Sequence, residues 1–250
     1  MVIHSLPDAD PAWAWFLDVD GTLIEIAKRP DAVRVDPRVV AALGTLQRMA
    51  QDAVALVSGR TILELDRLFA PSRLAAAGLH GLERRDAEGR TMRDAERDEH
   101  LDEAVAEMHA FAIGHPGVLV EDKGITVALH FRQVPGVADA ATRLLRSIAA
   151  QHEGRFVLQR GKMVVELRPP GFDKGGVVDA FMAEPPFAGR VPVFIGDDLT
   201  DEAGFAAVNR RGGYSIRIGG PAPTAARWHM DSVSALIDWL QAMPSARVGA

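Results

Sequence analysis

The sequence predicts an α/β protein with a Rossmann-like core, built on a parallel sheet, and an inserted α+β domain. Short apolar runs alternate with amphipathic segments of helical spacing in residues 1–97, which is typical of the βαβ units that form parallel sheets. Residues 98–168 instead follow the order helix, strand, strand, helix, strand, strand, which favours an antiparallel α+β unit. The first pattern returns in residues 169–250, so we expect the insertion to divide one core domain into two parts.

The first part of the core is organised around an apolar run that starts at Trp13 and ends abruptly at Asp18. A run of this length is expected to form a buried strand. Asp36 and Pro37 then predict the N-cap and first position of a helix, whose apolar face would comprise Val39, Val40, Leu43, Leu46, Met49 and Ala50. The pattern next predicts a strand at Ala53–Val57, a helix at Thr61–Phe69, a strand at Leu74–Leu79 and a polar hairpin at Glu83–Arg93.

The insertion and the second part of the core are predicted in the same way. In the insertion we expect helices at Leu101–Ile113 and Val137–Gln151 and strands at Val118–Val120, Thr126–Phe131, Phe156–Leu158 and Met163–Leu167. A return linker is expected at Pro169, Pro170 and Gly171. The core then resumes with a helix at Lys174–Ala183, a strand at Val191–Ile195, a helix near Glu202–Val208, a strand at Ser215–Ile218, a helix at Ser232–Met243 capped by Asp231, and a frayed tail at Pro244–Ala250.

Composition excludes several classes of protein. The hydrophobic and charged fractions, 48% and 25%, are those of an ordinary globular chain. A net charge of −6 disfavours nonspecific nucleic-acid binding, which needs a basic surface. The absence of cysteine excludes disulfides and thiolate zinc sites. No signal peptide and no apolar run of about 18 residues is recognisable, so we expect a soluble cytoplasmic protein without a membrane partner. The sequence does not fix the oligomeric state, and a monomer is one of the possibilities.

Asp18 and Asp20 are hard to explain by folding alone. Side chains two positions apart in a strand point to the same face, so the two carboxylates could converge on one cation or one reacting group. An aspartate at the end of a buried strand is costly unless a cation or hydrogen-bond donors compensate its charge. Gly21 would let the chain turn sharply after them. The alternative is an Asx turn that only closes the strand.

Two other predicted strands also end in polar residues. Ser58–Arg60 follows one of them, and Asp197 and Asp198 follow the other. The carboxyl ends of parallel strands meet at one edge of the sheet, where open α/β sheets bind ligands. Helix capping accounts well for Asp201 and Glu202. It does not account for Asp197, for which we favour a metal-binding role.

The residue types at this edge suit phosphoryl transfer. Carboxylates are ligands for a hard divalent cation, and Mg²⁺ is favoured when a phosphate completes its coordination. Lys174 at a helix start, a hydroxyl from Thr22 or Ser58, and free backbone N–H groups could hold a phosphoryl group. Such a reaction needs an oxygen nucleophile, a proton donor to the leaving group and charge neutralisation. Asp18 and Asp20 could divide the first two tasks.

The chain resembles the haloacid dehalogenase (HAD) superfamily, whose four motifs match DVDGT, Ser58, Lys174 and GDDLTD in the right order. The resemblance implies that Asp18 attacks phosphorus to give an aspartyl-phosphate. It implies that Asp20 protonates the departing alcohol and later activates water. This acid pair also separates phosphatases from dehalogenases, because hydrolysis of a phosphoester needs the second aspartate.

The same resemblance implies the ligands of the metal and of the phosphate. Mg²⁺ would be bound by Asp18, by the carbonyl oxygen of Asp20 and by Asp197. Asp198 is counted among the metal-binding residues as well. Either Asp198 or Asp201 would orient ligands and water. The phosphate would be bound by Ser58 and the catalytic Lys174. We count Thr22 and Gly59 among the substrate-binding residues as well.

The insertion is expected to select the substrate, because a cap over an open sheet edge excludes water and contacts the leaving group. The series LDVDGTL, SGR, GLHG, VEDKG, ALHFR, VVELRP and GDDLTDEAGF resembles the trehalose-6-phosphate phosphatase family over nearly the full chain. That resemblance implies hydrolysis of trehalose 6-phosphate, as in trehalose biosynthesis. It implies that the sugar hydroxyls are bound by Glu121, Lys123 and Glu166, with Arg60, His80, His130 and Arg132 as helpers.

Structural alternatives stay open for these polar residues. Glu121 and Lys123 suit a hairpin turn, His130 suits an ordinary strand position, and Glu166 suits a surface position on an alternating strand. A solvated surface is the simplest interpretation of the arginines at positions 84, 85, 90, 93 and 97.

Two competing functions remain at this stage. The first is another capped sugar phosphatase of the HAD superfamily, acting for instance on sucrose 6-phosphate or mannosyl-3-phosphoglycerate. The second is a non-catalytic homologue that regulates a sugar synthase. Loss of a catalytic acid or of the lysine would indicate that homologue, and the sequence retains Asp18, Asp20, Lys174 and Asp197.

Overall fold

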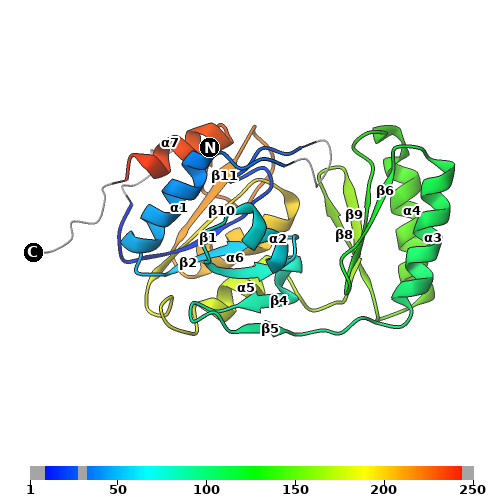
Figure 1. Cartoon of the computed structure of the whole chain (residues 1–250), viewed down its shortest axis with the longest axis horizontal. Helices are drawn as coiled ribbons and strands as arrows, with labels where there is room; N and C mark the ends of the chain where they lie inside the picture. The colour runs from blue at the N-terminus through cyan, green and yellow to red at the C-terminus, as the bar shows by residue number, and fades with distance from the viewer. Residues whose placement is uncertain (1–8, 28–32, 244–250) are drawn as a thin grey trace, which may run out of the picture. The chain divides into compact units, whose positions relative to one another are not determined.

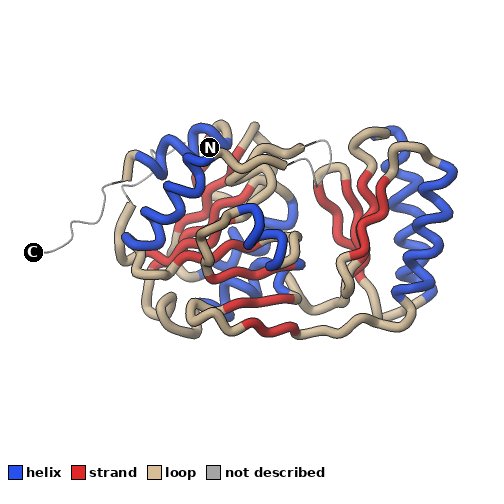
Figure 2. Tube along the Cα trace, viewed as in Figure 1, coloured by secondary structure: helices blue, strands red, loops and turns tan. Residues whose placement is uncertain are grey.

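The structure is a computed structural model that describes residues 9–27 and 33–243. The predicted frayed tail, Pro244–Ala250, lies outside the described residues. The chain forms two compact units (Figure 1, Figure 2). Within the described part, residues 9–27, 33–92 and 173–243 make up the core unit, and residues 93–172 make up the inserted unit.

The core unit contains the strands β1 (Trp13–Leu17), β2 (Val54–Val57), β3 (Ala75–Gly78), β4 (Glu83–Arg85), β5 (Thr91–Arg93), β10 (Val191–Gly196), β11 (Tyr214–Ile218) and β12 (Trp228–Met230). They form an 8-stranded sheet in the order β12-β11-β10-β1-β2-β3-β4-β5. The strands from β12 to β3 run parallel, and β4 is antiparallel to β3. Every residue of the central β1 is buried, as expected for a strand covered on both faces.

Helices cover both faces of this sheet (Figure 1). They are α1 (Pro37–Met49), α2 (Ile62–Leu68), α5 (Lys174–Phe181), α6 (Glu202–Arg210) and α7 (Val233–Gln241). Neighbouring side chains of β1 point to opposite faces: the ring centroid of Trp15 lies 5.8 Å from that of Trp239 in α7, and that of Phe16 lies 6.0 Å from that of Phe181 in α5. The predicted α/β class with a parallel sheet is therefore confirmed.

Side-chain caps set the starts of the helices. Asp36 accepts a hydrogen bond from the backbone N–H of Arg38 and is followed by a proline at the first turn of α1, as predicted. The predicted cap of α7 was wrong by one residue: the hydroxyl of Ser232, not the carboxylate of Asp231, accepts from the N–H of Ala235. Ser232 lies three residues before that amide, which is the distance that a capping side chain spans.

The inserted unit contains the helices α3 (Leu101–Gly114) and α4 (Ala138–Gln151) and the strands β6 (Leu119–Asp122), β7 (Val127–His130), β8 (Val157–Gly161) and β9 (Val164–Arg168). Its 4-stranded antiparallel sheet has the order β6-β7-β9-β8. Alternate residues of the inner strands pack into one apolar cluster with residues of the two helices: Val127, Leu129, Val165, Leu167, Leu101, Met108, Leu145 and Ile148. The intervening residues of β7 and β9 therefore lie on the opposite face of the sheet.

Two features of the core unit differ from the sequence prediction. Arg85 is not on a solvated surface: its side chain is 3% exposed, forms an ion pair with Asp66 and donates to the carbonyl of Leu74. Arg84 pairs with Glu184 and lies over the ring of Phe181. These partners are distant in the sequence, so charge alone did not reveal them. The strand β12 was also missed, because its 3 residues are too few to show an alternating pattern.

Among the described helices, none combines the length and the apolar composition that crossing a membrane requires.

Candidate active site

A tight turn follows β1 and carries the first acidic residues. The backbone N–H of Asp18 donates to the carbonyl of Ile195 at 2.9 Å, so Asp18 continues the pairing of β1 with β10. Gly21 has a φ of +93°, a conformation that glycine adopts without strain. A Cβ atom at this position would lie 2.1 Å from a carboxylate oxygen of Asp197. Gly21 therefore allows the turn after β1 to lie directly against the carboxylate that follows β10.

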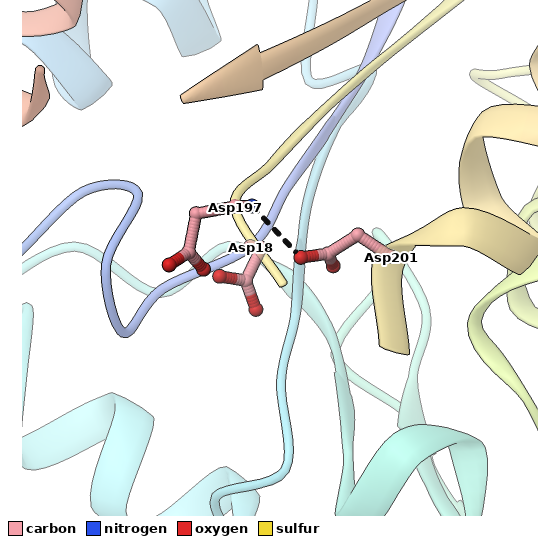
Figure 3. Close-up of side chains that lie close together, drawn as sticks. All are labelled: Asp18, Asp197 and Asp201. Atoms are coloured by element: carbon pink, nitrogen blue, oxygen red, sulfur yellow. Dashed lines mark hydrogen bonds between the residues drawn. The ribbon is translucent and has the colours of Figure 1, made fainter. Parts of the chain in front are cut away.

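Three buried carboxylates come together at this edge of the sheet (Figure 3). Asp18, Asp197 and Asp201 each offer an oxygen, and these oxygens lie within 4.8 Å of one another. Asp201 also accepts hydrogen bonds from the backbone N–H groups of Asp197 and Asp198, both at 2.9 Å. These two bonds fix Asp201 against the end of β10, and so bring the start of α6 to the carboxylate of Asp18.

Lys174 lies between two of these carboxylates. Its Nζ atom is 2.6 Å from Oδ1 of Asp18 and 2.6 Å from Oδ1 of Asp201. Lys174 is the first residue of α5, and Asp173 caps that helix by accepting from the N–H of Gly176. A positive charge in the first turn of a helix opposes the helix dipole, so helix formation does not favour a lysine here. The two carboxylates compensate the buried ammonium.

The electrostatics of the cluster favour a bound cation. Burial raises the pKa of the Asp18 carboxyl well above its usual range; Asp201 and Asp197 raise it further, and Lys174 lowers it. Burial alone would lower the pKa of the Lys174 ammonium, but Asp18 and Asp201 outweigh burial and raise it. The cluster combines three carboxylates with one ammonium, so negative charge predominates in it and favours a positive countercharge. A divalent cation with oxygen ligands would supply it, so the residues fit a metal such as Mg²⁺.

Asp20 lies near this cluster and binds Arg60. The guanidinium of Arg60 donates from Nε and Nη2 to the two oxygens of Asp20, at 2.6 and 2.7 Å. The backbone N–H of Arg60 donates to the hydroxyl of Ser58, which is buried. The hydroxyl of Thr22 is also buried, and no hydrogen-bond partner for it exists among the described residues. A buried hydroxyl of this kind is suited to bind a ligand oxygen.

His80 and Gly59 belong to the same edge. The backbone N–H groups of Leu79 and His80 donate to the carbonyls of Arg60 and Ser58, both at 2.9 Å. His80 has a φ of 57°, which is costly for a residue other than glycine and is typical of functional sites. A Cβ atom on Gly59 would lie 2.6 Å from Nε2 of His80. The turn after β3 therefore lies against the turn after β2, with the imidazole beside Gly59.

Asp198 and Asp201 differ from each other in placement. The side chain of Asp198 caps the short 3-10 helix Leu199–Asp201 by accepting from the N–H of Thr200. Asp201, which capping accounted for in the sequence, has both a capping role and a place in the acidic cluster. Asp201 reaches the strand end because its carboxylate accepts from the backbone N–H groups of Asp197 and Asp198.

Five of the seven predicted sugar-binding residues lie in the inserted unit, and four of these five gather on one face of its sheet. Nε2 of His130 is 2.7 Å from Oε2 of Glu121, and Nζ of Lys123 is 3.7 Å from the same oxygen. Lys123 also lies 3.5 Å from Oε1 of Glu166, whose side chain is 6% exposed. Glu166 is thus not a surface residue. Arg132 instead donates to the carbonyl of Lys162.

Comparison with known proteins identifies similar sequences and folds. The family model described as trehalose-phosphatase matches residues 16–234. The trehalose-6-phosphate phosphatase of Escherichia coli K12 is 44% identical over 245 residues, which cover 96% of this chain and 90% of that protein. The C-terminal domain of a trehalose-6-phosphate phosphatase from C. albicans has a TM-score of 0.82 at 21% identity, covering 92% of this chain and 91% of that one.

A more distant fold match is a phosphatase of the haloalkanoate (HAD) enzyme superfamily from Bacteroides thetaiotaomicron. Its TM-score is 0.62 at 17% identity, and the match covers 91% of this chain and 93% of that one. At such identities the two solved structures bear on the fold alone.

Proposed function

Because this chain belongs to the trehalose-phosphatase family and is a phosphatase, we propose that it hydrolyses trehalose 6-phosphate to trehalose and phosphate. The products would arise through an aspartyl-phosphate on Asp18, with Mg²⁺ as the metal. The buried cluster of Lys174 with Asp18 and Asp201 is the observation that carries this proposal. Such a cluster is costly for the fold and suits the binding of an anionic substrate beside a nucleophile.

In the first step a carboxylate oxygen of Asp18 attacks phosphorus, and the bond between phosphorus and the sugar oxygen breaks. Lys174 holds Oδ1 of Asp18 at 2.6 Å, which fixes the orientation of the nucleophile. The same ammonium would stabilise the negative charge on the phosphoryl oxygens. The hydroxyl of Thr22, which has no other partner within the described part of the chain, would donate to the phosphate. Ser58 and Gly59, in the neighbouring turn, would complete its binding site.

Asp20 would donate the proton that the leaving sugar oxygen takes up. In the second step it would accept a proton from the water that attacks phosphorus, which releases phosphate and regenerates Asp18. The Arg60 guanidinium binds both oxygens of Asp20. Arg60 bonds most strongly to the ionised carboxylate, so we expect its bonds to Asp20 to weaken whenever Asp20 carries the proton. We therefore assign Arg60 to Asp20 rather than to the sugar.

The metal would be held by Asp18 and Asp197, with the carbonyl of Asp20 as a further ligand; Asp201 would orient them through its bonds to the backbone of Asp197 and Asp198. When bound, a divalent cation supplies charge neutralisation to the phosphoryl group. A metal role of Asp198 stays a prediction, since its side chain caps the following 3-10 helix.

We propose that the inserted domain, predicted at residues 98–168, is a cap that recognises the sugar. Glu121, Lys123 and Glu166 supply hydrogen-bond acceptors and donors on one face of its sheet, with the Lys123 ammonium 3.7 Å from Glu121 and 3.5 Å from Glu166. Sugars present many hydroxyls and little apolar surface, so charged and polar side chains of this kind suit them.

The test is phosphate release from trehalose 6-phosphate, sucrose 6-phosphate, glucose 6-phosphate and p-nitrophenyl phosphate, with and without Mg²⁺. The proposal expects a Mg²⁺-dependent preference for trehalose 6-phosphate. Equal rates on all substrates would keep the phosphatase mechanism and remove the assigned substrate. No release from any of them would favour a regulatory role instead.

A further inference from the structure

β7, one of the two inner strands of the inserted sheet, has two faces with different chemistry. Val127 and Leu129 enter the apolar cluster under the helices. Thr126, Ala128 and His130 alternate with them and therefore lie on the other face. On that face Ala128 pairs in register with Glu121 of β6 and with Glu166 of β9. The two glutamates thus flank one alanine.

Thr126, one residue before β7, and His130, the last residue of β7, each bind one of these carboxylates. The Thr126 hydroxyl donates to Oε1 of Glu166 at 2.5 Å, and both residues are buried. Nε2 of His130 lies 2.7 Å from Oε2 of Glu121. Lys123 approaches the same two oxygens, at 3.5 and 3.7 Å. Each glutamate is therefore held by one donor, the hydroxyl of Thr126 or the ring of His130, and by the shared ammonium of Lys123.

These contacts have a physical consequence for binding. A glutamate side chain that is free to rotate loses about 1 kcal/mol or more of rotamer entropy when a ligand orders it. Burial alone would raise the pKa of the Glu121 carboxyl. The hydrogen bond from His130 and the charge of Lys123 outweigh burial, so the pKa is lowered. Glu121 is thus an ionised acceptor with a fixed orientation before any ligand arrives.

We propose that Thr126 and His130 are positioning residues, which orient Glu166 and Glu121 for the hydroxyls of the substrate sugar. This inference rests on the proposed function. It concerns residues that do not need to touch the sugar: they act through the two glutamates. The sugar is recognised as a neutral polyhydroxyl group, so its binding should depend on Thr126 and His130 even when no phosphate is present.

The first test replaces Thr126 in two ways. Thr126→Val keeps the shape and removes the hydroxyl, whereas Thr126→Ser keeps the hydroxyl. We expect Thr126→Val to raise the KM for trehalose 6-phosphate about tenfold, the size expected for loss of a hydrogen bond to a charged group. Its kcat/KM for p-nitrophenyl phosphate should stay within about twofold of wild type, and Thr126→Ser should restore most of the lost affinity.

A double-mutant cycle with Glu166→Ala separates positioning from structure. If Thr126 acts through Glu166, adding Thr126→Val to the Glu166→Ala enzyme should change the KM for the sugar phosphate less than about twofold. Independent effects that multiply would overturn the inference. So would an equal loss on both substrates, which indicates damage to the fold. Calorimetric titration with trehalose measures the affinity of each variant for the sugar without catalysis, and the same relation between the single and double variants is expected.

His130 is tested in parallel with Glu121. His130→Phe removes the ring nitrogen, and His130→Gln keeps a donor near Glu121. We expect His130→Phe to weaken trehalose binding several-fold and His130→Gln to recover part of it. Equal affinity in all three proteins would overturn the role of His130. A wild-type enzyme with no preference for trehalose 6-phosphate over p-nitrophenyl phosphate overturns the proposed function, and this inference with it; normal preference with unaffected variants overturns the inference alone.

Discussion

Replacement of Lys174 by methionine tests the electrostatic account of the candidate active site. Methionine has a similar length and no charge, so the change removes the ammonium from between two buried carboxylates. Lys174 is 3% exposed and lies 2.6 Å from oxygens of both Asp18 and Asp201. Loss of one partner of a buried ion pair costs about 3–5 kcal/mol, because the remaining charge is buried without compensation. We expect a loss of this size in the free energy of unfolding of the metal-free protein.

Mg²⁺ should reverse part of that loss without restoring activity. A cation that binds the native cluster stabilises the fold by mass action, and the cluster without Lys174 offers it one more uncompensated negative charge. Added Mg²⁺ should therefore stabilise Lys174→Met more than it stabilises the wild type. Phosphatase activity should nevertheless stay at least about 100-fold below wild type, since the ammonium would no longer orient the nucleophile or neutralise the phosphoryl group.

The assay is urea denaturation with and without Mg²⁺, followed by circular dichroism, together with phosphate release. Arg211→Met is the matched control: Arg211 forms an ion pair with Asp179 at 2.8 Å, but the two side chains are 39% and 44% exposed. An exposed pair contributes about 0–1 kcal/mol. Equal stability losses in the two variants, or no loss in metal-free Lys174→Met, would refute the electrostatic account.

Three other predictions test the remaining parts of the site. Asp18→Asn should abolish turnover and the acid-stable phosphate label on the protein; turnover near wild type would exclude the covalent route. Glu166→Ala should lower kcat/KM for trehalose 6-phosphate at least about tenfold and spare p-nitrophenyl phosphate, whereas equal losses would contradict cap recognition. Chelation should abolish activity on every substrate, and added Mg²⁺ should restore it. Inductively coupled plasma analysis of the chelated protein would measure its remaining metal content.

A pH prediction concerns the inserted unit. Arg97 hydrogen-bonds Asp122 and so lowers the pKa of that carboxyl below 3.8. A lowered native pKa contributes stability above the unfolded value, and this contribution is lost as pH falls through the native value. Arg97→Met should therefore remove stability at pH 7 and reduce the loss of stability below about pH 4. Parallel pH profiles of unfolding for the variant and the wild type would contradict the pair's role.

The order of elements and the residues of the sheet edge could be predicted from the sequence. Buried strands, helix caps and amphipathic faces are local patterns, and β1, α1 and the turn at Gly21 follow from them. The common edge then follows from the rule that parallel strands share direction. Partners distant in the chain could not be predicted in this way. Nothing near Arg85 in the sequence indicates that its guanidinium is buried and donates to Asp66 and to the carbonyl of Leu74.

Two residues, Asp201 and Glu166, also had a purely structural explanation in the sequence. In the sequence, Asp201 fits helix capping and Glu166 fits a surface position, because each local pattern accounts for one interaction per side chain. In the structure a carboxylate makes several. Asp201 accepts from two backbone N–H groups with one oxygen and from Lys174 with the other. Asp201 can therefore cap a helix and also belong to the acidic cluster. A local sequence rule that accounts for the capping role does not exclude the role in the cluster.

The same principle connects the two candidate sites. In the core unit the backbone of Asp197 and Asp198 fixes Asp201, and in the inserted unit Thr126 fixes Glu166. A small residue lies against the acids in each case: Gly21 against Asp197, and Ala128 between the two glutamates. Orientation of an acid needs a donor, and close approach needs space. A residue that supplies the donor or the space is not found by a search for catalytic or binding motifs, because its side chain does not itself contact the substrate.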